Sequence, residues 1–311
     1  MNESAKAFSP SGISSFFEIC ETDADGNAIN NPEKTGARGG GFGIQKGTLT
    51  EVSVSTAVKT KMRILINGRV THNAHTTKTA ARMLLEKTGK HWDILIRHQV
   101  DAPIGAGFGT SAGGALTTAL ALSKACGLNM TLNQLGRIAH ATEIECRTGL
   151  GTVGPLLVGG CVLTLEPGAP GIAVIDRIPI TSNHVIIAGV YGPTPTKKIL
   201  ASSLERRKEI TMCGRKTMDS ILAETSLENF LVCCLDFARK ARFMTKRLEE
   251  LVRLAEKVGV IGCAQNMVGE AIHALTTSEN AENVVQAFKQ VLPKDKILVS
   301  NVDLQGARLL S

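Results

Sequence analysis

The sequence has few aromatic side chains: they make up 4% of its 311 residues, with one Trp and one Tyr. Modules that bind single-stranded nucleic acid stack bases on aromatic faces, so this scarcity argues against a nucleic-acid partner. The net charge of +7 does not reverse that conclusion, because the basic residues within 206–216 and 239–247 are interleaved with acidic and apolar ones. Such runs are typical of solvated helix faces.

Long apolar runs and C-x-x-C motifs are also missing. No stretch reaches the ~18 consecutive apolar residues of a membrane span, and residues 1–12 lack the apolar core of a signal peptide. None of the eight cysteines forms a C-x-x-C pair, which argues against a zinc site. Their apolar neighbours are typical of buried thiols in a reducing compartment. We therefore expect a cytoplasmic protein with no membrane partner.

Strand-like and helix-like segments mix along the chain, which favours an α+β or α/β class. Residues 48–58 alternate as a strand does, and residues 245–258 carry an apolar stripe at helical spacing. The Pro/Gly cluster at 166–171 is the best candidate boundary. It divides the chain into residues 1–165 and 166–311, in agreement with the ~100–200 residues that one domain usually has.

Two further local patterns bear on function. Residues 37–47, ARGGGFGIQKG, are predicted to form a glycine-rich loop. Thr131 and Gln134 match a capping box, which predicts a helix that runs through Cys146. His273, the last histidine, lies in a segment with a helical pattern.

The stretch DAPIGAGFGTSAGG, residues 101–114, matches three known patterns. Residues 109–113 spell the G-x-S-x-G of a serine hydrolase, but eight residues separate them from the preceding strand, whereas a nucleophile elbow is a sharp strand-to-helix turn. Residues 107–112 spell the dinucleotide motif G-x-G-x-x-A, which needs an acid about 20 residues further on. The first acid is Glu143. Both patterns therefore lack the context that they require.

The third interpretation is a phosphate cradle, and it uses the whole segment. Gly105, Gly107 and Gly109 allow backbone N–H groups to converge on an anion. The helix that follows presents the positive end of its dipole. Thr110 and Ser111 add hydroxyls that can bind a phosphate oxygen or Mg²⁺. No lysine follows the glycines, so the loop is not a Walker A motif.

Residues 103–112 resemble the P-x-x-x-G-L-G-S-S-A motif of the GHMP kinase superfamily. Residues 8–19, 36–47 and 143–160 resemble motifs of its archaeal pantoate kinase branch, and residues 259–275 resemble the C-terminal glycine motif, all in the same order along the chain. The resemblance implies a two-lobed α+β fold, with a ribosomal-S5-like N-terminal lobe and a ferredoxin-like C-terminal lobe. It also implies a kinase that uses ATP and Mg²⁺ to phosphorylate the terminal hydroxyl of pantoate, giving 4-phosphopantoate for coenzyme A synthesis.

The resemblance also implies roles for individual residues near the glycine-rich loop. Ser111 and a glutamate on the next helix are expected to bind Mg²⁺. Family logic points to Glu143, although helical geometry does not separate it from Glu145. The residues expected on the ATP phosphates are Gly105, Ala106, Gly107, Phe108, Gly109, Thr110 and Ser111.

The acceptor side departs from the superfamily pattern. Thr152 stands where an Asp often positions or deprotonates the acceptor hydroxyl, so we expect Thr152 to hydrogen-bond the substrate and charge neutralisation to drive the transfer. A hydroxy-acid substrate carries a carboxylate, for which an arginine fork is suited. Arg38 and Arg147 are the candidate ligands, and Ser14 and Ser15 are candidate hydroxyl contacts.

Three alternatives stay open. Another GHMP substrate such as homoserine, mevalonate or shikimate would suit the same loop. Thr152 also invites a nucleotide-binding protein with weakened catalysis. The third alternative is an esterase with Ser111 as its nucleophile. A homodimer is a further expectation, because homodimers are common among soluble enzymes.

Overall fold

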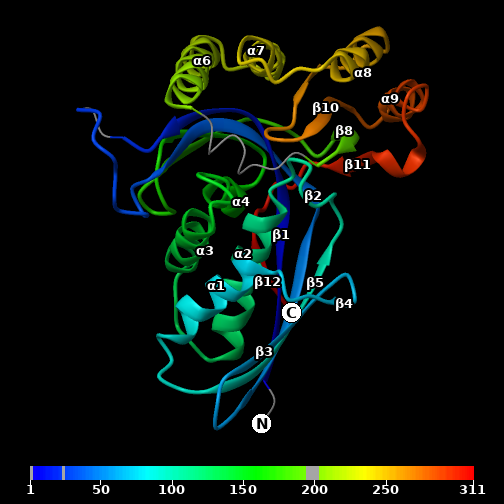
Figure 1. The fold of residues 1–311 in the computed structure, drawn as a ribbon. Coiled ribbons are helices and arrows are strands. Elements are labelled where there is room, and N and C mark those ends of the chain that lie inside the picture. The colour runs from blue at the N-terminus through cyan, green and yellow to red at the C-terminus, as the bar shows by residue number, and fades with distance from the viewer. Residues whose placement is uncertain (1–2, 23–24, 194–202) are drawn as a thin grey trace.

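The computed structural model describes residues 3–22, 25–193 and 203–311, which form two lobes, each built on its own sheet (Figure 1). The strand order of the first sheet is β12-β1-β2-β5-β3-β4. In addition, β6 pairs with β2, and β7 pairs with β6. Its strands are β1 (Glu3–Cys20), β2 (Gly36–Thr56), β3 (Lys61–Ile66), β4 (Arg69–Val70), β5 (Trp92–Val100), β6 (Cys161–Glu166), β7 (Val174–Ile178) and β12 (Arg308–Leu310). The α+β arrangement expected from the sequence is confirmed.

The glycine-rich segment 37–47 is part of β2, so the prediction of a loop there was wrong. β1 and β2 pair antiparallel along nearly their whole length, with irregularities between Ser9 and Ser11 and between Ser14 and Phe16. A Cβ on Gly41 would overlap the carbonyl oxygen of Ile13. These glycines therefore let two long, bulged strands approach closely, and the sequence pattern of a loop conceals this packing requirement.

Helices cover one face of the first sheet. α2 (Thr110–Ala125) lies against β1 and β2 and is itself covered by α1 (His75–Leu85) and α3 (Leu132–Cys146). α2 is rich in alanine and buried along almost its whole length, which lets the strands and two helices pack tightly around it. α4 (Val153–Val158) is a short helix that follows α3. The predicted capping box of α3 is present, with Gln134 and Thr131 bonding each other's backbone N–H groups.

The second lobe has a four-stranded antiparallel sheet in the order β11-β8-β10-β9. Its strands are β8 (His184–Gly192), β9 (Gly262–Gln265), β10 (Glu270–Thr277) and β11 (Ile297–Asn301). Its helical elements are α6 (Leu204–Ala223), α7 (Leu227–Lys240), α8 (Lys246–Lys257), α9 (Ala281–Phe288) and the 3-10 turn η1 (Lys294–Lys296). The helix predicted at 245–258 is confirmed as α8, whose apolar stripe is buried.

His273 lies in β10, not in a helix as predicted. β10 is a central strand whose residues from Ala271 to Thr276 are all buried, so it shows no alternation between polar and apolar positions. A short buried apolar segment has the same composition in a strand and in a helix.

The first sheet takes strands from both sides of the boundary predicted between residues 165 and 166. β7 follows that point in the chain yet pairs with β6, and β12 returns from the C-terminus to pair with β1. The chain therefore crosses between the lobes more than once, from β7 to β8 and from β11 back to β12. Within the described parts of the chain, no helix is both long enough and apolar enough to cross a bilayer.

Candidate active site

A cavity of about 440 Å³ lies where the two lobes meet. Its walls come from β1, β2, the loop before α2, the end of α3, the start of α4 and residues 267–268 of the second lobe. Among the described residues that line it, three are charged: Arg38, Glu143 and Arg147. All of the predicted site residues belong to its lining except Ala106 and Ser15.

The loop before α2 has the geometry expected of an anion cradle. Gly105, Gly107 and Gly109 have φ values of 80°, 81° and 58°, a backbone region that favours glycine. Gly109 is the N-cap of α2, where no side chain caps the helix and the first turn holds no acidic residue. The positive end of α2 is therefore open towards the cavity, and its uncapped N–H groups suit an anion such as phosphate.

Close packing holds this loop in place. The backbone N–H of Gly12 donates to the carbonyl oxygen of Phe108, at 3.0 Å. A Cβ on Gly107 would lie 3.0 Å from the Cβ of Asn266, and one on Gly269 would overlap the carbonyl oxygen of Ala106. Strand β1 and the β9–β10 connection therefore brace the loop. Ala106 is buried in the contact with Gly269 and helps to hold the loop in its conformation.

Glu143 lies at the centre of a group of hydroxyls. The hydroxyls of Ser111 and Thr148 both donate to its Oε1 atom, the second at 2.6 Å. Burial raises the pKa of Glu143, and the two hydrogen bonds partly offset that rise. Thr148 was not predicted, although its position in the loop just after Glu143 was a signal that could have identified it.

The structure distinguishes the two glutamates that helical spacing left equivalent. Glu145 lies at the surface, where Arg82 donates to it at 2.8 Å and 3.1 Å. Glu143 is 4% exposed and faces Ser111. The geometry therefore supports Glu143 and not Glu145 as the partner of the loop.

Thr152 is the N-cap residue of α4 and faces the same part of the cavity. A Cβ on Gly109 would lie 2.9 Å from its methyl group, and one on Gly12 would lie 3.1 Å from it. Among the described residues, nothing forms a hydrogen bond with the Thr152 hydroxyl. Its methyl group thus packs on the loop, and its hydroxyl is free to bind a ligand.

The two candidate cations differ in their partners. Arg38 donates from Nε to the carbonyl oxygen of Leu165 at 2.7 Å and from a terminal nitrogen to Glu18 at 3.0 Å. Arg147 is exposed, follows α3 with φ 54°, and forms no ion pair within the described part of the chain. The side chain of Arg147 therefore forms no ion pair among the described residues, whereas that of Arg38 is held by a buried carboxylate.

The structure brings Ser14 to the cavity and places Ser15 behind it. The fully buried hydroxyl of Ser15 lies 3.0 Å from Nε2 of His273, and Nδ1 of His273 lies 2.9 Å from Oδ1 of Asn266. Burial lowers the pKa of His273 to about 3. This neutral chain joins β1 to the β9–β10 connection, so Ser15 supports the junction and does not face the cavity.

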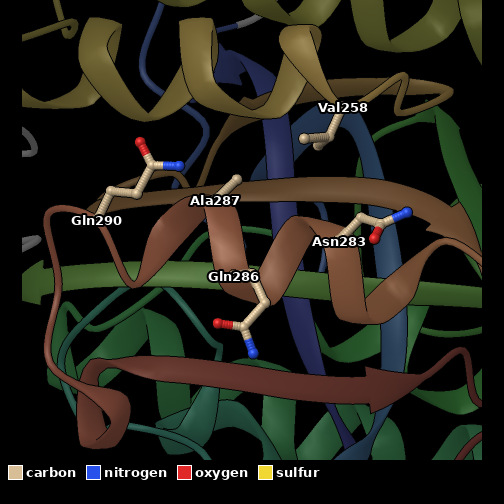
Figure 2. Close-up of a pocket in the computed structure, with 5 residues that line it drawn as sticks. All are labelled: Val258, Asn283, Gln286, Ala287 and Gln290. Atoms are coloured by element: carbon tan, nitrogen blue, oxygen red, sulfur yellow. The ribbon is translucent and has the colours of Figure 1, made fainter.

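A second cavity, of about 290 Å³, lies on the outer part of the second lobe and contains none of the predicted site residues. Figure 2 shows the side chains that line it, three amides and one alanine on or just after α9 together with Val258. None of these five residues is charged. The chemistry therefore concentrates in the first cavity.

Comparison with known proteins agrees with this geometry. The family model for the GHMP kinases N-terminal domain matches residues 75–160, which span α1 to α4 and include the loop, Ser111, Glu143 and Thr152. A solved structure described as a phosphotransferase related to the CoA biosynthesis pathway superposes with a TM-score of 0.87 at 28% identity, covering 98% of each chain. The expected GHMP-kinase-like fold is thereby confirmed.

Relatives with established names narrow the class. A pantoate kinase of Thermococcus kodakarensis is 31% identical over 93% of this chain and 94% of its own length. A pantoate kinase of Methanocaldococcus jannaschii is 28% identical over 91% of this chain and 96% of its own. The chain belongs to the pantoate kinase family of the GHMP kinases.

Proposed function

We propose that this protein transfers the γ-phosphoryl group of ATP to the terminal hydroxyl of pantoate, giving 4-phosphopantoate for coenzyme A synthesis. The observation that carries the proposal is the convergence of Ser111 and Glu143 beside the open N-terminus of α2, in a cavity that two arginines also line. The pantoate kinase relatives supply the substrate class.

At the nucleotide end, backbone atoms do most of the binding. The loop residues that line the cavity, Gly105 and residues 107–111, and the N-terminus of α2 suit the triphosphate. The hydroxyl of Thr110 adds a side-chain donor. Because these groups are fixed before ATP arrives, little reorganisation is needed at the moment of transfer.

The residues present suit a hard divalent cation. Mg²⁺ prefers oxygen ligands and usually binds one or two carboxylates together with substrate phosphates. Ser111 and Glu143 offer a hydroxyl and a carboxylate in contact with each other, and we propose that they hold Mg²⁺ with ATP. When bound, the ion neutralises charge that develops on the phosphates. Thr148 keeps the carboxylate of Glu143 in place at 2.6 Å.

At the acceptor end, positioning replaces a carboxylate base. Glu143 is the one carboxylate among the described residues that line the cavity, and it is engaged with Ser111. Phosphoryl transfer proceeds through a loose transition state in which orientation and charge neutralisation dominate. We propose that Thr152 orients the acceptor hydroxyl while Arg147, Arg38 and Ser14 bind the rest of the hydroxy acid.

The setting of the reaction follows from the same features. We propose a cytoplasmic enzyme that acts on a small hydroxy acid without membrane or nucleic-acid partners, supported by the scarcity of aromatic residues and of long apolar runs. A homodimer is part of the proposal and is tested by sedimentation of the purified protein.

The decisive experiment measures ADP release and the phosphorylated product with ATP, Mg²⁺ and a panel of acceptors. We expect turnover with pantoate and little with homoserine, mevalonate or shikimate. Preference for one of those three would change the proposed acceptor but leave the proposed kinase activity standing. ATP binding without turnover on any acceptor would favour a nucleotide-binding protein, the alternative that Thr152 supports.

Covalent labelling and ATP binding separate the kinase from the esterase. An esterase needs a histidine beside its nucleophile, and none of the described residues that line the cavity is a histidine. Labelling of Ser111 by a fluorophosphonate, together with absence of ATP binding, would contradict the proposal.

A further inference from the structure

Arg38 lies between the cavity and a buried carboxylate, Glu18, for which the sequence predicted no role. Glu18, near the end of β1, has a side chain that is 3% exposed. Its Oε2 accepts from Arg38 at 3.0 Å, and its Oε1 accepts from Arg215 on α6 at 3.0 Å. One buried carboxylate thus joins a cavity residue of the first lobe to a helix of the second.

The backbone is shaped to allow this contact. A Cβ on Gly214 would overlap the carbonyl oxygen of Phe17, so the absence of a side chain lets α6 lie directly on β1. Figure 1 shows the end of β1 and the start of β2 passing beneath α6. Arg215, the next residue, then reaches Glu18 with both Nε and a terminal nitrogen.

The charges of these three residues do not cancel. Glu18 and Arg38 alone would form a neutral pair, and the second guanidinium leaves a net charge of +1. Arg38 has five N–H donors. Its Nε and one terminal nitrogen are engaged, and its other terminal nitrogen has no partner among the described residues. The guanidinium is therefore fixed and can still bind a carboxylate fork.

We infer that Glu18 and Arg215 are positioning residues for acceptor recognition, which fix the Arg38 guanidinium at the cavity wall and keep the cluster positive so that the site selects acceptors bearing a carboxylate. The inference rests on the proposed function, because it assigns Arg38 to the carboxylate of the acceptor. It gives α6, which contributes no residue to the cavity lining, a part in substrate choice.

The test compares Arg215→Gln with a matched variant, Arg207→Gln. Arg207 lies on the same helix and pairs with Glu21 near the same end of β1, but this pair does not reach the cavity. Arg215→Gln should raise the KM for pantoate about fivefold, the upper range for a partly exposed ion pair. The KM for ATP and kcat should stay unchanged, and Arg215→Lys should restore most of the loss.

Two further readouts separate recognition from general stability. The effect of Arg215→Gln should shrink in high salt, because the Arg215 side chain is 64% exposed. It should also be absent for the amide of pantoate, which has no carboxylate. Equal changes in both KM values, the same change in Arg207→Gln, or no change in the KM for pantoate would overturn the inference while leaving the proposed function standing.

Failure of the proposed function gives a different result. A wild-type protein that turns over another acceptor refutes pantoate as substrate, and the same variants are then compared on that acceptor and on its uncharged analogue. If nothing is turned over, calorimetric binding of pantoate replaces the KM. Wild-type protein that binds no pantoate contradicts both.

Discussion

The two ends of the cavity are built in different ways. The proposed nucleotide end is one contiguous stretch, residues 105–111, whose backbone geometry is set by three glycines. The proposed acceptor end takes side chains from β2, the end of α3 and the start of α4, and Glu18 links it to Arg215 on α6. A backbone cradle tolerates few changes in local sequence, whereas an assembled set of side chains can be altered one position at a time.

This difference explains where the chain departs from its superfamily. The loop keeps its glycines and Ser111, but Thr152 replaces the usual carboxylate at the acceptor end. Variants at each end should therefore fail differently. Changes around the loop and Glu143 should lower kcat for any acceptor, and changes at the acceptor end should have smaller effects that depend on the substrate.

The largest effect is expected from Glu143→Gln. The uncharged amide cannot replace the carboxylate that faces Ser111, so kcat should fall about 10²- to 10³-fold, as on loss of one preorganised electrostatic group. Glu145→Gln is the matched control, because Glu145 lies two residues further along the same helix and is paired with Arg82 at the surface. It should leave kcat unchanged. Equal losses in both variants would contradict the assignment of Glu143.

The same variant should gain stability in the absence of ligand. Burial raises the folded-state pKa of Glu143 above its ordinary value of 4.5. The folded protein therefore binds this proton more tightly than the unfolded chain, and stability falls as the pH rises from 4.5 through the raised pKa. Urea unfolding at pH 8 should show Glu143→Gln to be more stable than the wild type, with the difference vanishing towards pH 4.

Gly149→Ala should have the next largest effect. Its Cβ would lie 2.5 Å from Oε2 of Glu143, so the carboxylate would have to move. A change that disturbs the orientation of a metal ligand costs roughly 10- to 100-fold in metal affinity or activity. Gly192→Ala is the control, because a Cβ there meets no atom of the described residues within 4 Å. A Gly149→Ala variant whose Mg²⁺ dependence matches the wild type would show that Glu143 is not held as tightly as the contacts indicate.

The local structure of the glycine-rich loop and of α3 could be predicted from the sequence more fully than the contacts around Thr152, Arg38 and Arg147. The loop can be identified from the sequence because the glycines that form it are close together in the chain. The capping box at Thr131 correctly predicted the helix that carries Glu143. Choosing Glu143 over Glu145 required the fold, since both lie on one helix and only packing separates them. Nothing local could reveal Glu18 and Arg215, which are 197 residues apart and meet because Gly214 admits α6.

Substitution of Thr152, at the proposed acceptor end, should lower kcat less than the two changes described above. Thr152→Ala removes one hydroxyl that orients the acceptor, and the net value of one neutral hydrogen bond, ~1 kcal/mol, corresponds to about a fivefold loss in kcat. Thr152→Asp restores the superfamily's carboxylate and should add a limb to the pH profile of kcat at low pH, where the new acid is protonated. Both variants should retain the wild-type KM for ATP. Unchanged turnover in both would remove Thr152 from the mechanism.

The smallest effect on activity is expected from His273→Gln, at the point where the two ends are tied together. His273 joins Ser15, which follows the cavity residue Ser14, to Asn266, which packs on Gly107 of the loop. A glutamine can keep one of the two hydrogen bonds, so we expect kcat and both KM values to change by less than about threefold, on the scale of one hydrogen bond.

The clearer signature of His273 is the pH dependence of stability. Burial lowers its pKa from 6.5 to about 3, so the folded protein binds fewer protons than the unfolded chain between those values. The stabilisation that neutral His273 provides is complete above pH 6.5 and is lost as the pH falls towards 3. The stability advantage of wild type over His273→Gln should therefore shrink between pH 7 and pH 4.5 in urea unfolding. A constant difference for His273→Gln would mean that its ring is not held neutral, and that the junction between the two ends is more open than the packing indicates.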